Sequence, residues 1–192
     1  AGKAKIETLL NESVKRKKLS EEEKTKLLEH VKTLSSLEKI SDSDLVIEAV
    51  FEDLELKHSL YKKIEPYLKA NAILASNTST LPITKLSEAL QDSTRFIGIH
   101  FFSPVEKMNL VEIIKSEQTN EKSLAVALDY VSLLKKTPIV VNDSRGFYAN
   151  RCIIPYINEG LRMLSEGIEP ALIENSAKHI GMPVGPLQLL DE

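Results

Sequence analysis

Features that mark secreted, membrane-spanning or nucleic-acid-binding proteins are missing from this sequence. The 192 residues include one cysteine, Cys152, so no internal disulfide can form and a reducing compartment is indicated. No apolar run approaches the roughly 18 residues that a membrane span needs, and no signal-peptide pattern opens the chain. The net charge of −3 gives no sequence-wide basic field for nucleic acid. No metal site is predicted. What remains is the composition of an ordinary soluble globular protein, 42% hydrophobic and 28% charged.

The chain also lacks an initiator methionine, and its first residues already follow a helical pattern, so we expect a segment of a longer protein. Apolar residues at helical spacing predict a helix over 3–16 that runs into the basic stretch 15–18. That stretch is typical of a solvated helix end, and a clamp for a polyphosphate is the alternative. Ser20 and Glu23 form a capping box, which predicts a second helix to about Leu34.

Short apolar segments alternate with helical ones through the middle of the chain, which predicts an α/β fold with a parallel sheet and crossover helices. The first strand reads as covered on both faces, although Glu48 interrupts it and needs a polar partner. Beyond 142–146 the pattern is helical only, so we expect two domains, 1–143 and 144–192. The predicted strands are 45–50, 72–76, 95–104, 109–114 and 138–141, and the predicted helices are 54–68, 82–90, 121–135, 147–166 and 170–180.

One histidine and one glutamate interrupt two of these buried strands and dominate the functional interpretation. If the two strands fold back on each other, residue 100 lies opposite residue 112, with Cβ atoms roughly 4.5–5.5 Å apart. Glu112 would then fix the tautomer of His100 and stabilise its imidazolium form, which makes a general base with an orienting acid. The alternative is a buried histidine that is merely satisfied by a buried glutamate.

Further polar residues follow two of the predicted strands at their carboxyl ends, where this architecture presents its ligands. Glu52 and Asp53 come after the first strand, and the run Asn77–Thr80 comes after the second. Taken alone, such a run is more often a turn and a helix cap than a binding site.

Six blocks in order along the chain carry a resemblance to a known family. Together they resemble the L-3-hydroxyacyl-CoA dehydrogenases, in particular the dehydrogenase part of the fused enoyl-CoA hydratase/dehydrogenase proteins of fatty acid β-oxidation. The resemblance covers essentially all 192 residues and implies NAD-dependent oxidation of a 3-hydroxyacyl-CoA to a 3-oxoacyl-CoA. The blocks are 47–53 (IEAVFED), 75–79 (ASNTS), 98–104 (GIHFFSP), 110–114 (LVEII), 143–147 (DSRGF) with 150–151 (NR), and 181–186 (GMPVGP).

The resemblance also implies roles for individual residues. His100 matches the catalytic base and Glu112 the carboxylate that pairs with it, while Ser79 and Asn150 match the residues that meet the substrate oxygen and the thioester region. Arg16 lies where relatives meet the phosphates of CoA. Ser103 stands where many relatives carry asparagine. The positions that match cofactor-lining residues are Glu52, Lys57, Asn77, Ser79 and Ser103.

One departure from the family pattern concerns the dinucleotide fingerprint. No G-x-G-x-x-G motif is present, because the first two glycines are Gly2 and Gly98. We therefore expect a partial Rossmann-type NAD-binding domain that lacks its first βαβ unit, followed by the start of an all-α domain, with the chain truncated at both ends and inactive by itself. The alternative is a non-catalytic acyl-CoA-binding or structural relative that has lost the cofactor.

Partners and location follow from the resemblance alone. Relatives dimerise through the helical domain, which suggests a possible homodimer, and a bacterial cytoplasm is favoured over a mitochondrion or peroxisome. No nucleic-acid partner is expected.

Overall fold

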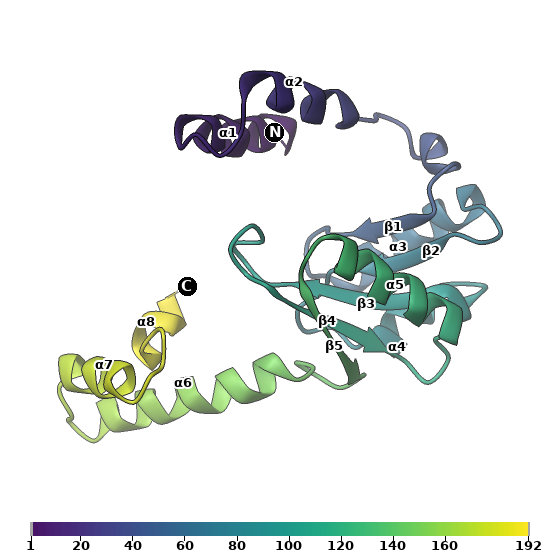
Figure 1. Ribbon diagram of the computed structural model, residues 1–192. Coiled ribbons are helices and arrows are strands. Elements are labelled where there is room, and N and C mark those ends of the chain that lie inside the picture. The colour runs from purple at the N-terminus through teal and green to yellow at the C-terminus, as the bar shows by residue number, and fades with distance from the viewer. Residues whose placement is uncertain (1, 192) are drawn as a thin grey trace. The chain divides into compact units, whose positions relative to one another are not determined.

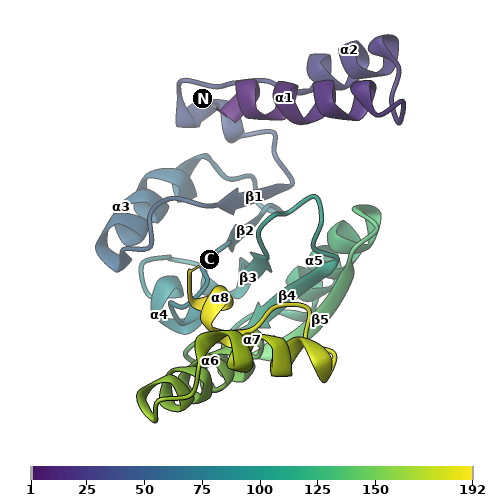
Figure 2. The same cartoon turned by 90° about the vertical axis from the view of Figure 1, so that its left-hand side faces the viewer.

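A computed structural model describes residues 2–191, and the chain divides between Ser41 and Asp42 into two compact units. In the first unit, α1 (Gly2–Lys15) and α2 (Glu21–His30) lie side by side, and a short 3₁₀ helix, η1 (Leu37–Ile40), follows (Figures 1 and 2). The predicted capping box is present, since Glu23 N donates to Ser20 Oγ and Ser20 N donates to Glu23 Oε2.

The second helix ends at His30 rather than near Leu34, so it is shorter than predicted. The residue after it, Val31, has an extended backbone with φ −88° and ψ 103°. Val31 is β-branched, and Thr33, Ser35 and Ser36 lie within the next five residues. Their local preference for extended backbone outweighs the apolar spacing that suggested a longer helix.

The second unit is built on one five-stranded sheet in the order β1-β2-β3-β4-β5. All neighbouring strands are parallel except β3 and β4, which form the predicted antiparallel pair. The strands are β1 (Leu45–Glu48), β2 (Ile73–Ser76), β3 (Phe96–Phe101), β4 (Leu110–Lys115) and β5 (Thr137–Asn142). The helices between them are α3 (Leu54–Ile64), η2 (Glu65–Tyr67), α4 (Ile83–Ser87), η3 (Ser93–Arg95) and α5 (Glu121–Leu133).

The first strand and the α4 helix both end earlier than predicted. The first strand ends at Glu48 instead of Val50, because Val50 N donates to the Glu48 carboxylate at 2.6 Å instead of to a neighbouring strand. Three of its four residues are half-buried, so the expected cover on both faces is incomplete among the described residues. The α4 helix ends at Ser87 rather than near Leu90.

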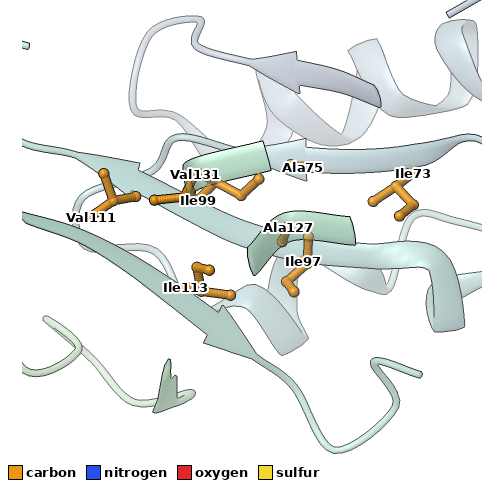
Figure 3. Packing of buried hydrophobic residues seen from close by; sticks show 8 residues of the cluster. All are labelled: Ile73, Ala75, Ile97, Ile99, Val111, Ile113, Ala127 and Val131. Carbon is orange, nitrogen blue, oxygen red and sulfur yellow. The ribbon is translucent and has the colours of Figure 1, made fainter. Parts of the chain in front are cut away.

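One face of the sheet packs against α5 to form the core shown in Figure 3. Alternate residues of the three central strands point to this face, as the two-residue period of a strand requires. Ala127 and Val131 of α5 meet them one helical turn apart, and all eight side chains of the cluster are at most 2% exposed. The strand residues of the cluster are Ile73, Ala75, Ile97, Ile99, Val111 and Ile113.

The intervening residues of β3 and β4 point to the opposite face, and His100 and Glu112 are among them. Gly98 lies two residues before His100 on this face, tight against Ile83 of α4 and Ile114 of β4. A Cβ atom at position 98 would lie 2.8–2.9 Å from their side chains, so only glycine fits without displacing α4 or β4. The packing of α5 on one side thus directs the two polar residues to the other.

Beyond β5 the chain is helical, with α6 (Ala149–Ser165), α7 (Pro170–His179) and α8 (Pro186–Asp191) packed on one another. The last of these was not predicted, because six residues are too few to show a helical period. Within residues 2–191, no helix combines the length and apolar character that crossing a bilayer requires.

Candidate active site

His100 and Glu112 are register partners in the antiparallel β3/β4 pair, as predicted. The imidazole Nδ1 lies 2.7 Å from Glu112 Oε2, and the two residues are 4% and 0% exposed. Phe102 and Phe147 flank the imidazole ring, with centroid separations of 4.6 and 6.0 Å. The hydrogen bond is therefore sheltered from water, which strengthens it.

The second oxygen of Glu112 reaches the start of α6. Its Oε1 accepts from the backbone amides of Tyr148 and Ala149, at 3.0 and 2.8 Å. Burial works to raise the pKa of Glu112, but the hydrogen bonds from His100 and from these amides outweigh it and lower the pKa. Because an ionised carboxylate only accepts, Nδ1 of His100 carries the hydrogen and Nε2 of the neutral ring is left as a proton acceptor.

The side chain of Asn77 and the backbone of Ser79, both in the turn after β2, are hydrogen-bonded to neighbouring elements. Asn77 Oδ1 accepts from the backbone amide of Phe101, at 2.9 Å, next to His100 in β3. The backbone oxygen of Ser79 accepts from Asn150 Nδ2 at 2.8 Å. Asn150 stands in the first turn of α6, just after the two amides that hold Glu112. The structure thus links Ser79, Asn150, Glu112 and His100 through one helix start.

Glu52 also holds this turn. Its Oε1 accepts from the amides of Ser79 and Thr80, at 2.9 and 3.1 Å, and from the Thr78 hydroxyl. Burial again works to raise the pKa of this carboxyl, yet these hydrogen bonds and nearby Lys57 lower it to about 2. The run 77–80 therefore serves as a turn while it also presents the Ser79 side chain, which is exposed.

The remaining predicted residues lie in different environments. Lys57 is 1% exposed, and its ammonium group lies 2.7 Å from Glu48 and 3.3 Å from Glu52, so it is an internal cation. Ser103 is exposed in the connection between β3 and β4. Arg16 follows α1 in the first unit with its side chain 68% exposed, 3.7 Å from Glu12.

Comparison with known proteins assigns the chain to a family. Residues 1–144 match the model of the 3-hydroxyacyl-CoA dehydrogenase NAD binding domain, and residues 146–192 match that of the 3-hydroxyacyl-CoA dehydrogenase C-terminal domain. The chain belongs to the 3-hydroxyacyl-CoA dehydrogenase family. The resemblance carried by the six sequence blocks is thereby confirmed, and NAD is the cofactor of the family domain that the chain matches.

Individual relatives of this dehydrogenase family agree with the assignment. The fatty acid oxidation complex subunit alpha of Shewanella amazonensis is 43% identical over 184 residues, which are 96% of this chain and 26% of that protein. The chain thus spans about a quarter of the length of the curated relatives it matches. Among solved structures, (S)-3-hydroxybutyryl-CoA dehydrogenase from Ralstonia eutropha has a TM-score of 0.94 and 39% identity, covering 98% of this chain and 67% of that one. The 3-hydroxybutyryl-CoA dehydrogenase of Escherichia coli has the same TM-score and 30% identity, covering 98% and 40%. The predicted α/β class with a helical continuation is confirmed.

Sequence reasoning missed the two backbone amides that hold Glu112, because a backbone donor has no side-chain signature. A signal was nevertheless present. A long helix begins after Tyr148 without a capping side chain, so its first amides need an acceptor from elsewhere in the fold. The partners of Glu48 were also missed, although the need for a partner was predicted.

Proposed function

We propose that the full-length protein catalyses NAD-dependent oxidation of (S)-3-hydroxyacyl-CoA to 3-oxoacyl-CoA in fatty acid β-oxidation. The observation that carries the proposal is the buried hydrogen bond of 2.7 Å between His100 Nδ1 and Glu112 Oε2. The lowered pKa of Glu112 keeps this carboxyl an acceptor, so the hydrogen lies on Nδ1 and Nε2 of the neutral ring is free to accept a proton. Family membership supports it, as do relatives named for a fatty acid oxidation complex and for 3-hydroxybutyryl-CoA oxidation. A histidine held only for packing would not need a carboxylate that is itself held by two amides.

In this proposal His100 Nε2 takes the proton of the substrate 3-hydroxyl as the C3–H bond breaks, and it returns the proton in the reverse direction. Glu112 stays ionised and stabilises the imidazolium, as the aspartate of a catalytic triad does. The Ser79 hydroxyl donates to the substrate oxygen. Asn150 holds the Ser79 turn through its side-chain amide and lies beside the thioester.

The residues around the Ser79 turn fit a nicotinamide cofactor. Glu52 keeps 34% of its side chain exposed, and a carboxylate at the carboxyl end of a strand accepts hydrogen bonds from sugar hydroxyls. We propose that Glu52, Asn77, Ser79 and Ser103 line the site for the ribose and nicotinamide of NAD. Lys57 lies behind these residues. Bound NAD supplies the hydride acceptor. A glycine-rich pyrophosphate cradle is not among the residues of this sequence.

We further propose different roles for two parts of the chain. Residues 1–143 belong to the NAD-binding domain, with Arg16 meeting the phosphates of CoA, and residues 144–192 begin the helical domain, through which a homodimer forms. The bacterial relatives support a cytoplasmic location.

The test is NADH formation by the full-length gene product with NAD and (S)-3-hydroxybutyryl-CoA, followed by absorbance. The proposal expects turnover that depends on both the thioester and NAD. If the purified protein binds the thioester, measured by calorimetry, but forms no NADH, it is a non-catalytic acyl-CoA-binding relative and the proposal fails.

A further inference from the structure

A buried chain of charges runs from the end of β1 to the turn that carries Ser79. It begins at Glu48, whose side chain is fully buried. Each carboxylate oxygen of Glu48 accepts two hydrogen bonds. Oε1 accepts from Lys57 Nζ at 2.7 Å and Val50 N at 2.6 Å, and Oε2 accepts from Tyr61 OH at 2.6 Å and Ser76 Oγ at 2.8 Å. The carboxylate is thus completely satisfied and held in one orientation.

The next group in the chain is the ammonium of Lys57, which points its donors in three directions. It meets Glu48 Oε1 at 2.7 Å, the backbone oxygen of Val50 at 3.2 Å and Glu52 Oε2 at 3.3 Å. One buried cation is therefore shared between two carboxylates, so the charge on Glu48 decides how strongly Lys57 attracts Glu52.

The far end of the chain is the Ser79 turn itself. Glu52 uses one oxygen for Lys57 and the other for the amides of Ser79 and Thr80. A shift of the Glu52 carboxylate therefore moves the backbone that carries the Ser79 hydroxyl. The connection from Glu48 to Ser79 is continuous, with every link an ion pair or hydrogen bond of 3.3 Å or less.

Fold stability alone does not require this arrangement. Burying an ion pair costs desolvation, and well-packed apolar residues of the same volume often stabilise a fold as well or better. The chain of charges does what apolar packing cannot, because it delivers a fixed carboxylate to two backbone amides at the candidate active site.

We propose that Glu48 is a positioning residue, which acts through Lys57 and Glu52 to set the place of the Ser79 hydroxyl against the substrate oxygen. The inference rests on the proposed function for the role of Ser79. Its structural part, control of the Ser79 turn by the charge on Glu48, does not depend on that function.

The test compares Glu48→Gln with Tyr61→Phe in the full-length protein. In Glu48→Gln, the NH₂ group can face the hydroxyls of Tyr61 and Ser76, which are able to accept. The amide oxygen then still accepts from Lys57, so Lys57 keeps this hydrogen bond but no longer faces a negative charge at position 48. Lys57 then moves toward Glu52 and draws it from the turn. Tyr61→Phe is the matched control, because it removes a donor from the Glu48 oxygen that does not touch Lys57.

Two readouts separate positioning from a purely structural role. For Glu48→Gln we expect kcat to fall about tenfold or more while the KM for the acyl-CoA changes less, because the Ser79 contact matters most in the transition state. Hydrogen exchange of the Ser79 and Thr80 amides should also quicken. Tyr61→Phe should lower the melting temperature with both readouts unchanged. If Glu48→Gln behaves as Tyr61→Phe does, the inference is overturned.

Two other outcomes still test the inference, namely a Glu48→Gln protein that does not fold and a wild-type protein without dehydrogenase activity. If Glu48→Gln does not fold, the double variant Glu48→Gln/Lys57→Met removes both buried charges and keeps an apolar side chain in place. The inference expects this variant to fold, to turn over slowly and to exchange the two turn amides quickly, and wild-type kcat in it would overturn the inference. If the wild-type protein has no dehydrogenase activity, the proposed function fails, and amide exchange alone then decides whether Glu48 controls the turn.

Discussion

Replacing Glu112 by glutamine reverses the proton arrangement on which His100 depends. Glu112 faces three donors, namely His100 Nδ1 and the amides of Tyr148 and Ala149. Glutamine offers one oxygen and one NH₂ group. The two helix-start amides cannot become acceptors, so the oxygen stays with them and the NH₂ group faces the imidazole. Nδ1 must then accept, and the hydrogen moves to Nε2, the nitrogen that should take the substrate proton.

The size of the effect follows from this wrong tautomer. A positioned general base contributes about 10²–10⁴-fold, and the equivalent acid-to-amide change in a serine protease triad lowers kcat by about 10⁴. We therefore expect Glu112→Gln to lower kcat by about 10²–10⁴-fold, with NAD binding nearly unchanged. The free energy of unfolding should fall by about 1–3 kcal/mol, because a charge-assisted hydrogen bond is lost in a buried site.

NADH absorbance with (S)-3-hydroxybutyryl-CoA measures the first effect and chemical denaturation measures the second. Glu174→Gln is the matched control, since the Glu174 carboxylate similarly accepts from the first amides of α8, Leu187 N at 2.8 Å and Gln188 N at 3.2 Å. The control should lose stability and keep its kcat. A Glu112→Gln protein whose kcat stays within about threefold of wild type would refute the tautomer argument.

Three further perturbations follow from the geometry. Asn150→Asp sets a carboxylate against the Ser79 backbone oxygen in place of a donor, so kcat should fall about 10–100-fold; kinetics equal to wild type would contradict this. The Glu52 pKa is lowered from 4.5 to about 2, so its stabilisation is complete above pH 4.5 and lost as pH falls toward 2. Denaturation across that range should show a smaller pH dependence for Glu52→Gln than for wild type, and parallel curves would count against the assignment. Gly98→Ala brings a Cβ to 2.9 Å from Ile114 Cβ and should lower the free energy of unfolding by about 1–3 kcal/mol. A melting temperature equal to that of wild type would contradict this, because β4 would then move aside at no cost.

Regular patterns made the centre of the candidate site predictable from sequence. His100 and Glu112 could be paired because strand residues alternate with a period of two and the connection between the strands is short. The polar run after β2 could be placed at the carboxyl edge of the sheet because carboxyl ends of parallel strands share one edge. Local periodicity carries this much information without any knowledge of tertiary contacts.

Interactions between distant parts of the sequence were not predictable in the same way. The partners of Glu48 include Ser76, which lies 28 residues away, and Glu112 meets amides more than 30 residues further on. Lys57 matches a cofactor-lining position, yet the fold turns its ammonium inward to Glu48. Such contacts depend on strand order and on where a helix begins, which no local pattern specifies.

His100→Gln tests the central claim most directly, because the variant keeps a polar side chain of similar size and removes the titratable ring. Turnover of (S)-3-hydroxybutyryl-CoA and NADH binding by fluorescence are measured on the same full-length preparation. The account predicts that turnover falls at least about 10²-fold while NADH binds as it does to wild type. Turnover close to wild type with intact binding would contradict it.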